Sequence, residues 1–295
     1  MRRVVMAPLV GLLIVLAFAA RPAVGQQIPG PQGPEEGISR RQLWLLSLPG
    51  ERMLMRALVF RPPGAGPFPL AVINHGSAQN AEHRARAPLP EYGIASRWFL
   101  DRGYAVVVPQ RPGHGETGGP YLEDQGRCET ADYHGSGLAT ADSIQAAIDD
   151  MTAEPFVRKS GVVVVGLSAG GWGALALASR NPKMVTAVIN IAGGRGGRAD
   201  DKPENNCAPD RLVAAAGEFG LAARIPTLWL YSENDSYFAP ALSKRMYETF
   251  RNTGGSAEYR LLPPFGADGH LLMNSSDAFV LWAPIIAKFL AQLGA

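Results

Sequence analysis

Residues 161–171 have the sequence GVVVVGLSAGG. Four consecutive valines stand between Gly161 and Gly166, and such a run of β-branched residues is typical of a parallel strand that is buried on both faces. Residues 169–179 are rich in alanine and favour a helix. The sequence therefore predicts a strand, a sharp turn at Ser168 and a helix, in the pattern that exposes a serine on the turn.

On both sides of this stretch, short apolar runs alternate with segments of helical periodicity. Strands that alternate with helices predict an α/β fold, in which a mostly parallel central sheet has helices on both faces. Residues 42–48 and 52–61 flank Pro49-Gly50 and predict an N-terminal antiparallel hairpin. The other expected strands are 70–74, 104–109, 161–166, 185–192, 227–232 and 257–262. The expected helices are 94–102, 138–151, 169–179, 240–252 and 278–293.

Two N-terminal segments are expected to precede a single domain of residues 40–295. Residues 1–25 begin with two arginines, continue as an uncharged apolar run and end on small residues, which is the pattern of a signal peptide. The alternative is a membrane anchor. Residues 26–39 are rich in proline and glycine and predict a flexible tether. We therefore expect export to the periplasm or the medium, with no stable membrane insertion after the signal is removed.

Charge and cysteine content exclude several classes of function. The formal net charge is +2, and removal of residues 1–25 would take away three arginines and no acid, which changes it to −1. This balance gives no electrostatic case for nucleic-acid binding. Two cysteines, Cys128 and Cys207, are too few for a structural zinc site, and we expect no metal or organic cofactor. In an oxidising compartment the two cysteines could pair, or they could equally be separate buried thiols.

Ser168 needs a base and an acid to act as a nucleophile. A serine hydroxyl attacks efficiently only when a histidine takes its proton and a carboxylate orients that histidine. After a strand–serine–helix turn, the expected order along the chain is nucleophile, acid and histidine. His270 is the only histidine after Ser168, and its alternative is a surface or capping role. Asp235, just past an apolar strand, is the expected acid, with Glu233 and Asp268 as rivals.

Backbone N–H groups are the expected donors to a substrate oxygen that becomes charged. The N–H of Ala169, directly after the serine, is one candidate. The N–H of Ser77 is the other, because His75-Gly76-Ser77 follows the apolar run 70–74 and glycine allows a tight turn there. The alternative for this loop is a plain turn.

Two long excursions, residues 110–134 and 193–224, interrupt the alternation of strands and helices. Connections of this length are usually functional loops or lids. Six charged residues lie between positions 195 and 204, so we expect a soluble ester of modest size as substrate rather than a lipid. Three aromatic residues near the expected catalytic positions could line a substrate pocket, although core packing suits the first equally well: Trp172, Tyr237 and Phe238.

The sequence resembles the α/β-hydrolase superfamily, and within it the dienelactone-hydrolase-like and acylaminoacyl-peptidase-like branch. The match rests on residues 75–77, 111–115 and 166–171, together with Asp235 and Gly269-His270. The resemblance implies a serine hydrolase that cleaves small carboxylic esters through an acyl-enzyme. Dienelactone hydrolases often use cysteine as the nucleophile, and the serine here argues against dienelactone as the substrate. The alternatives are an aminopeptidase or amidase of the same fold and a non-catalytic binding protein.

Overall fold

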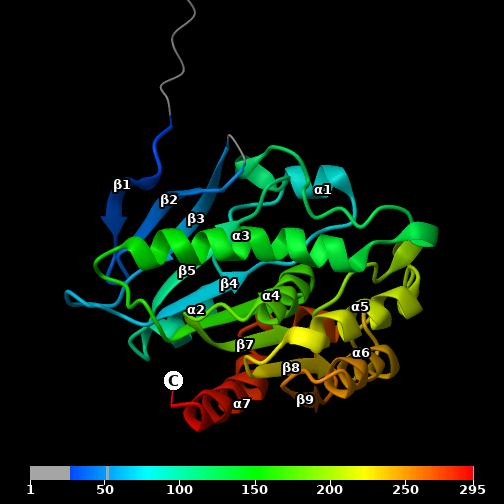
Figure 1. Ribbon diagram of the computed structural model, residues 1–295. Helices are drawn as coiled ribbons and strands as arrows, with labels where there is room; N and C mark the ends of the chain where they lie inside the picture. The colour runs from blue at the N-terminus through cyan, green and yellow to red at the C-terminus, as the bar shows by residue number, and fades with distance from the viewer. Residues whose placement is uncertain (1–26, 51–52, 295) are drawn as a thin grey trace, which may run out of the picture.

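The computed structural model describes residues 27–50 and 53–294, and the predicted signal peptide lies outside them. In this part of the chain nine strands form one sheet, in the order β1-β2-β3-β5-β4-β6-β7-β8-β9 (Figure 1). The strands are β1 (Gly30–Glu36), β2 (Arg41–Ser47), β3 (Leu54–Phe60), β4 (Leu70–Asn74), β5 (Ala105–Gln110), β6 (Val162–Leu167), β7 (Val185–Ile191), β8 (Thr227–Ser232) and β9 (Ala257–Leu262). Neighbours from β5 to β9 pair in parallel, whereas β1, β2 and β3 pair antiparallel. The predicted fold, including the N-terminal hairpin, is confirmed.

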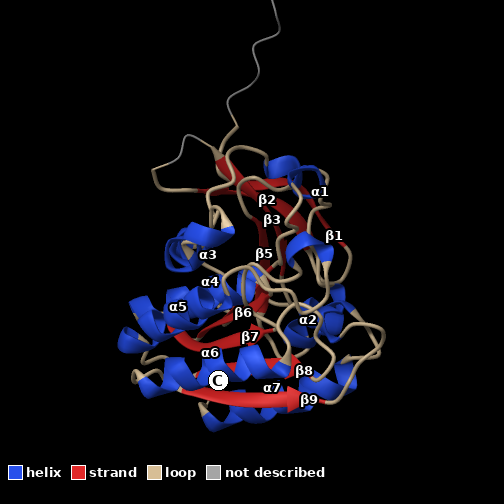
Figure 2. Cartoon of the chain, turned by 90° about the vertical axis from the view of Figure 1, so that its right-hand side faces the viewer, coloured by secondary structure: helices blue, strands red, loops and turns tan. Residues whose placement is uncertain are grey.

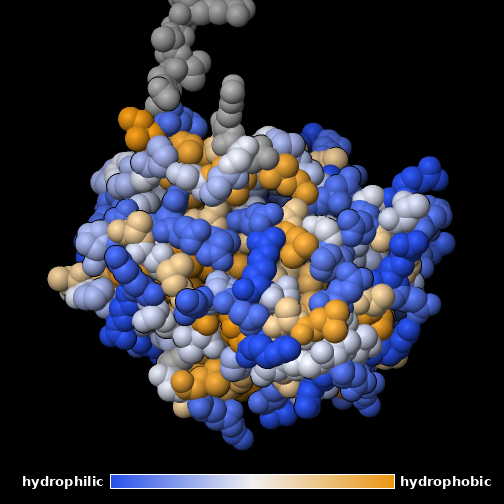
Figure 3. All heavy atoms as spheres, viewed as in Figure 1, coloured by the Kyte–Doolittle hydropathy of each residue, from blue (hydrophilic) through white to orange (hydrophobic). Residues whose placement is uncertain are grey.

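Helices cover both faces of the sheet (Figure 2). They are α1 (Ala81–Ala85), α2 (Gly93–Leu100), α3 (Tyr133–Ala153), α4 (Ala169–Arg180), α5 (Pro209–Ala222), α6 (Pro240–Asn252) and α7 (Phe279–Gln292). One hydrophobic cluster joins the sheet to α3, α4, α5 and α6, and a second joins its other face to α2 and α7. The outer surface of the first layer is largely hydrophilic, with apolar residues in small scattered groups (Figure 3). No helix in the described ranges is both long and apolar enough to span a bilayer.

The four valines of β6 contribute alternately to the hydrophobic clusters on the two faces of the sheet. Val162 and Val164 belong to the cluster under α3 and α4, and Val163 and Val165 belong to the opposite cluster. Each of the four is at most 1% exposed. Burial of a valine side chain contributes roughly 1.5–3 kcal/mol, so a polar residue at any of these positions would weaken the fold.

The expectation of a flexible tether was wrong for residues 30–36, which form strand β1. This strand pairs with β2 at the edge of the sheet, where Pro31 lies opposite Trp44. Proline and glycine are tolerated there because an edge strand has one side without a bonding partner. The register is irregular between Gln32 and Glu36, as expected for a strand of this composition.

The second half of the excursion at residues 193–224 forms helix α5 and belongs to the folded core. Helix α5 buries Leu212 and Phe219 completely against the helical layer, so this half is not a lid. The first excursion contains two short 3-10 turns, η1 (Gly115–Thr117) and η2 (Cys128–Thr130). A disulfide bond between Cys128 and Cys207 joins the two excursions, so the pairing alternative is the one present.

Removal of this disulfide should destabilise the fold. It closes a loop across a sequence separation of 79 residues. By restricting the unfolded chain, such a disulfide typically adds roughly 2–4 kcal/mol to the free energy of unfolding. We expect the free energy of unfolding of the double variant Cys128→Ser, Cys207→Ser to be lower by this amount. Urea titration followed by circular dichroism should show an unfolding midpoint at a lower urea concentration. Dithiothreitol should shift the native protein in the same way and leave the variant unchanged. An identical midpoint for all four samples would contradict a stabilising disulfide.

Candidate active site

Ser168 lies on the turn between β6 and α4. Its backbone has φ 54° and ψ −121°, a region that non-glycine residues rarely adopt. The Ser168 N–H donates to the Ile191 carbonyl at 3.0 Å, and the Ser168 carbonyl accepts the Gly194 N–H at 3.2 Å. Gly170 permits the close packing of α4, because a Cβ there would lie 2.5 Å from the Asn74 carbonyl oxygen. The strained turn is therefore held by the ends of β7 and β4.

Asp235 and His270 meet at the same edge of the sheet, although 35 residues separate them. The two carboxylate oxygens of Asp235 lie 3.1 and 3.2 Å from His270 Nδ1. Asp235 is 1% exposed, and its Oδ1 also accepts the N–H groups of Tyr237 at 2.8 Å and Phe238 at 2.9 Å. These bonds fix the orientation of the carboxyl group. An imidazole that donates Nδ1–H to this carboxylate leaves Nε2 as its proton acceptor.

Ser168 and His270 line one cavity of about 410 Å³. The Tyr237 ring stacks on the imidazole with 4.0 Å between centroids and so fixes its plane. No hydrogen bond joins Ser168 to His270 in the part of the chain that is described. Hydrogen bonds between a nucleophile and its base are often long before substrate binds and shorten in the complex. The observation that relates Ser168 to His270 is therefore that both side chains line the same cavity.

The two rival acids occupy other positions. Glu233 is exposed. Asp268 Oδ1 accepts the N–H groups of Ser236 and His270, both at 3.0 Å, and its Oδ2 accepts the Ser236 hydroxyl at 2.6 Å. Burial raises the pKa of Asp268, but the hydrogen bonds from Ser236 and His270 outweigh it and the pKa lies below its usual value. Asp268 therefore ties the Asp235 loop to the His270 loop and does not orient the imidazole.

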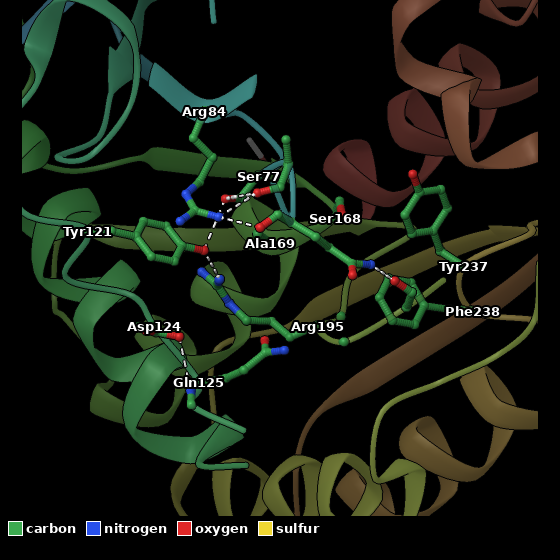
Figure 4. A pocket seen from close by; sticks show the side chains of 16 residues that line it. Ser77, Arg84, Tyr121, Asp124, Gln125, Ser168, Ala169, Arg195, Tyr237 and Phe238 are labelled. Carbon is green, nitrogen blue, oxygen red and sulfur yellow. Dashed lines mark hydrogen bonds between the residues drawn. The ribbon is translucent and has the colours of Figure 1, made fainter. Parts of the chain in front are cut away.

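Two backbone N–H groups beside Ser168 have no acceptor among residues 27–50 and 53–294. Ser77 and Ala169 line a cavity of about 320 Å³ together with Ser168 (Figure 4). In the described chain neither N–H donates a hydrogen bond to another residue. A Cβ at Gly76 would lie 3.2 Å from Ser168 Cβ, so glycine lets this loop close onto the serine. Both amides are thus available to a ligand.

The Ser77 side chain is held by a network that sequence reasoning did not find. Its hydroxyl lies 2.9 Å from His114 Nε2 and 3.0 Å from the Tyr121 hydroxyl. Burial, together with the charge of Arg111, lowers the pKa of His114 to about 3, so this imidazole is neutral. Its Nδ1 lies 3.1 Å from the Pro112 carbonyl and donates to it, which leaves Nε2 to accept the Ser77 proton. His114 lies in residues 111–115, which carry the family resemblance, but the sequence did not indicate that it bonds to the Ser77 hydroxyl.

A buried charge cluster lies behind this network. Arg111 Nε donates to Glu123 Oε1 at 2.8 Å, and Arg195 forms a second ion pair with the same carboxylate. The exposed fractions are 1%, 2% and 5% for Arg111, Glu123 and Arg195. Burial lowers the pKa of each arginine to about 10, so both are charged at neutral pH. Glu123 lies in the excursion at residues 110–134 and Arg195 in the one at residues 193–224, and no pattern in the sequence indicates that the two form an ion pair.

The aromatic residues divide between the cavity and the core. Tyr237 and Phe238 line the cavity beside Ser168. The prediction that Trp172 lines the pocket was wrong. Its side chain is fully buried, and its Nε1–H donates to the Tyr133 carbonyl at 2.8 Å within the core. Within residues 27–50 and 53–294, no group of three or more His, Cys, Asp and Glu side chains is arranged to hold a metal ion.

A mostly parallel sheet with a serine on a strained turn after a central strand defines the α/β-hydrolase class. A family model described as the alpha/beta hydrolase family matches residues 72–293, and the chain belongs to this family. No curated protein sequence matches the chain.

Solved structures share the fold at low identity. The uncomplexed acylaminoacyl peptidase of Pyrococcus horikoshii matches with a TM-score of 0.62 and 14% identity, over 85% of this chain and 41% of that protein. This chain thus spans about two fifths of the length of the acylaminoacyl peptidases. An esterase of Pyrococcus furiosus matches with a TM-score of 0.60 and 14% identity, over 90% of this chain and 99% of the other. A structure from Klebsiella pneumoniae assigned to the dienelactone hydrolases has a TM-score of 0.52 and 16% identity, over 85% and 97% of the chains.

The bonds of Asp268 predict a pH-dependent contribution to stability. Because the folded-state pKa lies below the unfolded value, the contribution is present above the unfolded pKa and is lost as pH falls through the folded pKa. We expect Asp268→Asn to lower the free energy of unfolding by about 1 kcal/mol at pH 7 and by less below about pH 4. Asp277, an exposed aspartate nine residues further along the chain, gives the matched control Asp277→Asn. Urea titrations from pH 3 to 8 measure both, and equal pH profiles for the two variants would contradict the assignment.

Proposed function

We propose that this α/β hydrolase cleaves carboxylic esters through an acyl-enzyme formed on Ser168. One observation carries the proposal: the strained serine lines the same cavity as an imidazole whose Nδ1 is bonded to the buried Asp235. This gives the serine a base and gives the base its orienting carboxylate. His270 acts as general base and then as general acid.

The reaction follows from these roles. As Ser168 Oγ attacks the ester carbonyl carbon, its proton passes to His270 Nε2 and the carbonyl oxygen becomes an anion. The N–H groups of Ser77 and Ala169 donate to this anion, and each such donor contributes about 3–4 kcal/mol of transition-state stabilisation. Collapse breaks the ester C–O bond, and the alcohol leaves with the proton from His270. Water then repeats the sequence on the acyl-enzyme and releases the acid.

The charge of the cavity favours an ester over an aminopeptidase substrate. An aminopeptidase needs carboxylates to bind the positively charged N-terminus of its substrate. The cavity beside Ser168 presents Arg84 and Arg195 instead. Its one carboxylate among the described lining residues, Asp124, is exposed and accepts the Gly126 N–H at 3.0 Å. The meeting of Asp235 with His270 also argues against a binding protein without catalysis.

We further propose that residues 1–25 are a signal peptide and that the mature protein is exported. The bond between Cys128 and Cys207 supports this, because disulfides persist in oxidising compartments. Mass spectrometry of the protein from its native host should show a chain that begins at Gln26. A chain that retains residues 1–25 in the cell fraction would contradict export.

Substitution of the three proposed catalytic residues should remove activity without unfolding the protein. We expect Ser168→Ala and His270→Ala to abolish hydrolysis of 4-nitrophenyl acetate, and Asp235→Asn to lower kcat about 10⁴-fold because the imidazole takes the wrong tautomer. A fluorophosphonate probe should label the native protein and leave Ser168→Ala unlabelled. Ser179→Ala, at the other end of helix α4, is the matched control and should keep native rates. Full esterase activity in Ser168→Ala would refute the proposal, and faster cleavage of aminoacyl anilides than of esters would favour the amidase alternative.

A further inference from the structure

Two cavities meet at Ser168, and they differ in what they offer a substrate. Ser168, Ser77, Arg84 and Tyr237 line both the cavity of about 320 Å³ and the cavity of about 410 Å³. His270 lines the larger one. The alcohol that leaves must take its proton from His270, so the alcohol part of an ester lies in the larger cavity. The acyl part then extends into the smaller cavity.

The wall of the smaller cavity carries more positive than negative charge. Its one carboxylate among the described lining residues, Asp124, is exposed and forms no ion pair with Arg84 or Arg195. Arg195 lines this cavity and shares the single carboxylate of Glu123 with Arg111, so two buried cations have one buried anion. Burial and the charge of Arg111 lower the pKa values of His75 and His114, so neither imidazole adds or removes charge at neutral pH. An uncompensated buried charge destabilises the fold, and a bound anion would offset this.

The Arg195 side chain also has unused hydrogen-bonding capacity. Its Nη1 donates to the Tyr121 hydroxyl at 2.8 Å. Its Nε is buried and, among the described residues, has no partner. Arg195 is 5% exposed, so water does not replace the missing acceptor freely. This is a buried, charged donor on the wall of a cavity that opens at Ser168.

Arg84 adds a second cation and lines both cavities. Figure 4 shows its guanidinium beside the ring of Tyr121. Its guanidinium lies 3.8 Å from the centre of the Tyr121 ring. Its Nη1 donates to the carbonyls of Ala78 at 3.0 Å and Gln79 at 2.6 Å. No carboxylate lies within ion-pair distance of Arg84 in the part of the chain that is described. Arg84 and Arg195 thus both contact the aromatic side chain of Tyr121, and neither cation is neutralised by a carboxylate of its own.

We propose that the smaller cavity is a subsite for a carboxylate on the acyl part of the substrate, so that the enzyme prefers half-esters of dicarboxylic acids. This rests on the proposed function, because the position of the acyl part follows from the role of His270. A carboxylate would balance the charge of Arg195 and Arg84 with charge-assisted hydrogen bonds. A neutral acyl chain would leave that charge unbalanced, and a cationic chain would add to it.

The test compares two esters of equal acyl length, mono-4-nitrophenyl glutarate and 4-nitrophenyl pentanoate, which differ in a terminal carboxylate and a terminal methyl group. We expect kcat/KM of the native protein to be at least tenfold higher for the charged ester, and this preference should fall as sodium chloride is added. Arg84→Gln should reduce the ratio of the two kcat/KM values about tenfold, because one charge-assisted contact is lost.

Arg86→Gln is the matched control, since Arg86 lies two residues further along, is 76% exposed and pairs with Glu82 outside the cavity. It should keep the native ratio. Arg195→Lys keeps the charge and removes the planar fork, and it should also lower the ratio; circular dichroism reports whether it folds. A native ratio near one, with Ser168 still labelled by fluorophosphonate, would overturn the subsite and leave the proposed function intact. Absence of both labelling and hydrolysis would overturn the proposed function and the subsite with it.

Discussion

The backbone of Ser168 has φ 54° and ψ −121°, a conformation that costs a non-glycine residue on the order of 1–3 kcal/mol. The sheet holds it there through hydrogen bonds to the end of β7 and to the loop after it. The loop after β4 closes on the serine at Gly76. Because β4, β6, β7 and β8 are parallel, their carboxyl ends lie at one edge of the sheet. The loops after these strands therefore carry Ser77, Ser168, Arg195 and Asp235 to one place.

The wall of the smaller cavity depends on a different kind of constraint. It comes from two irregular excursions, and bonds distant in sequence hold them together. The disulfide joins them at Cys128 and Cys207, and the Cys207 N–H donates to the Gly196 carbonyl at 2.8 Å. Arg195 reaches from one excursion to Glu123 of the other. Breaking a buried pair of this kind typically costs 3–5 kcal/mol, so the same contacts that charge the cavity also fix its shape.

Much of the fold could be predicted from the sequence, because a buried parallel strand and an amphipathic helix each leave a periodic pattern. The four valines before Ser168 have such a pattern, and the structure places them as predicted. Strand β1 was missed because its pairing with β2 at a sheet edge tolerates proline and glycine, which otherwise indicate a loop. Order along the chain selected His270, and position just past a strand selected Asp235; the structure brings the two side chains together.

The rest of the candidate site could not be predicted because its contacts join irregular segments. Nothing in the sequence near Glu123 indicates that it lies against Arg111 and Arg195, and the burial of all three appears only once the excursions are folded. Trp172 shows the converse. It is close in sequence to Ser168, but one turn of helix directs its indole into the core. Nearness in sequence to a proposed catalytic residue is therefore a poor guide to which side chains line a cavity.

If Ser168 is the nucleophile, an acyl group must be bonded to it during turnover. The most direct test is to quench the protein with acid during turnover of a 4-nitrophenyl ester and to map the adduct by tandem mass spectrometry. We expect the peptide that contains Ser168 to gain the mass of the acyl group less one hydrogen, and this increase should disappear as deacylation proceeds. Hydrolysis that continues while the adduct lies on another residue would contradict acylation of Ser168.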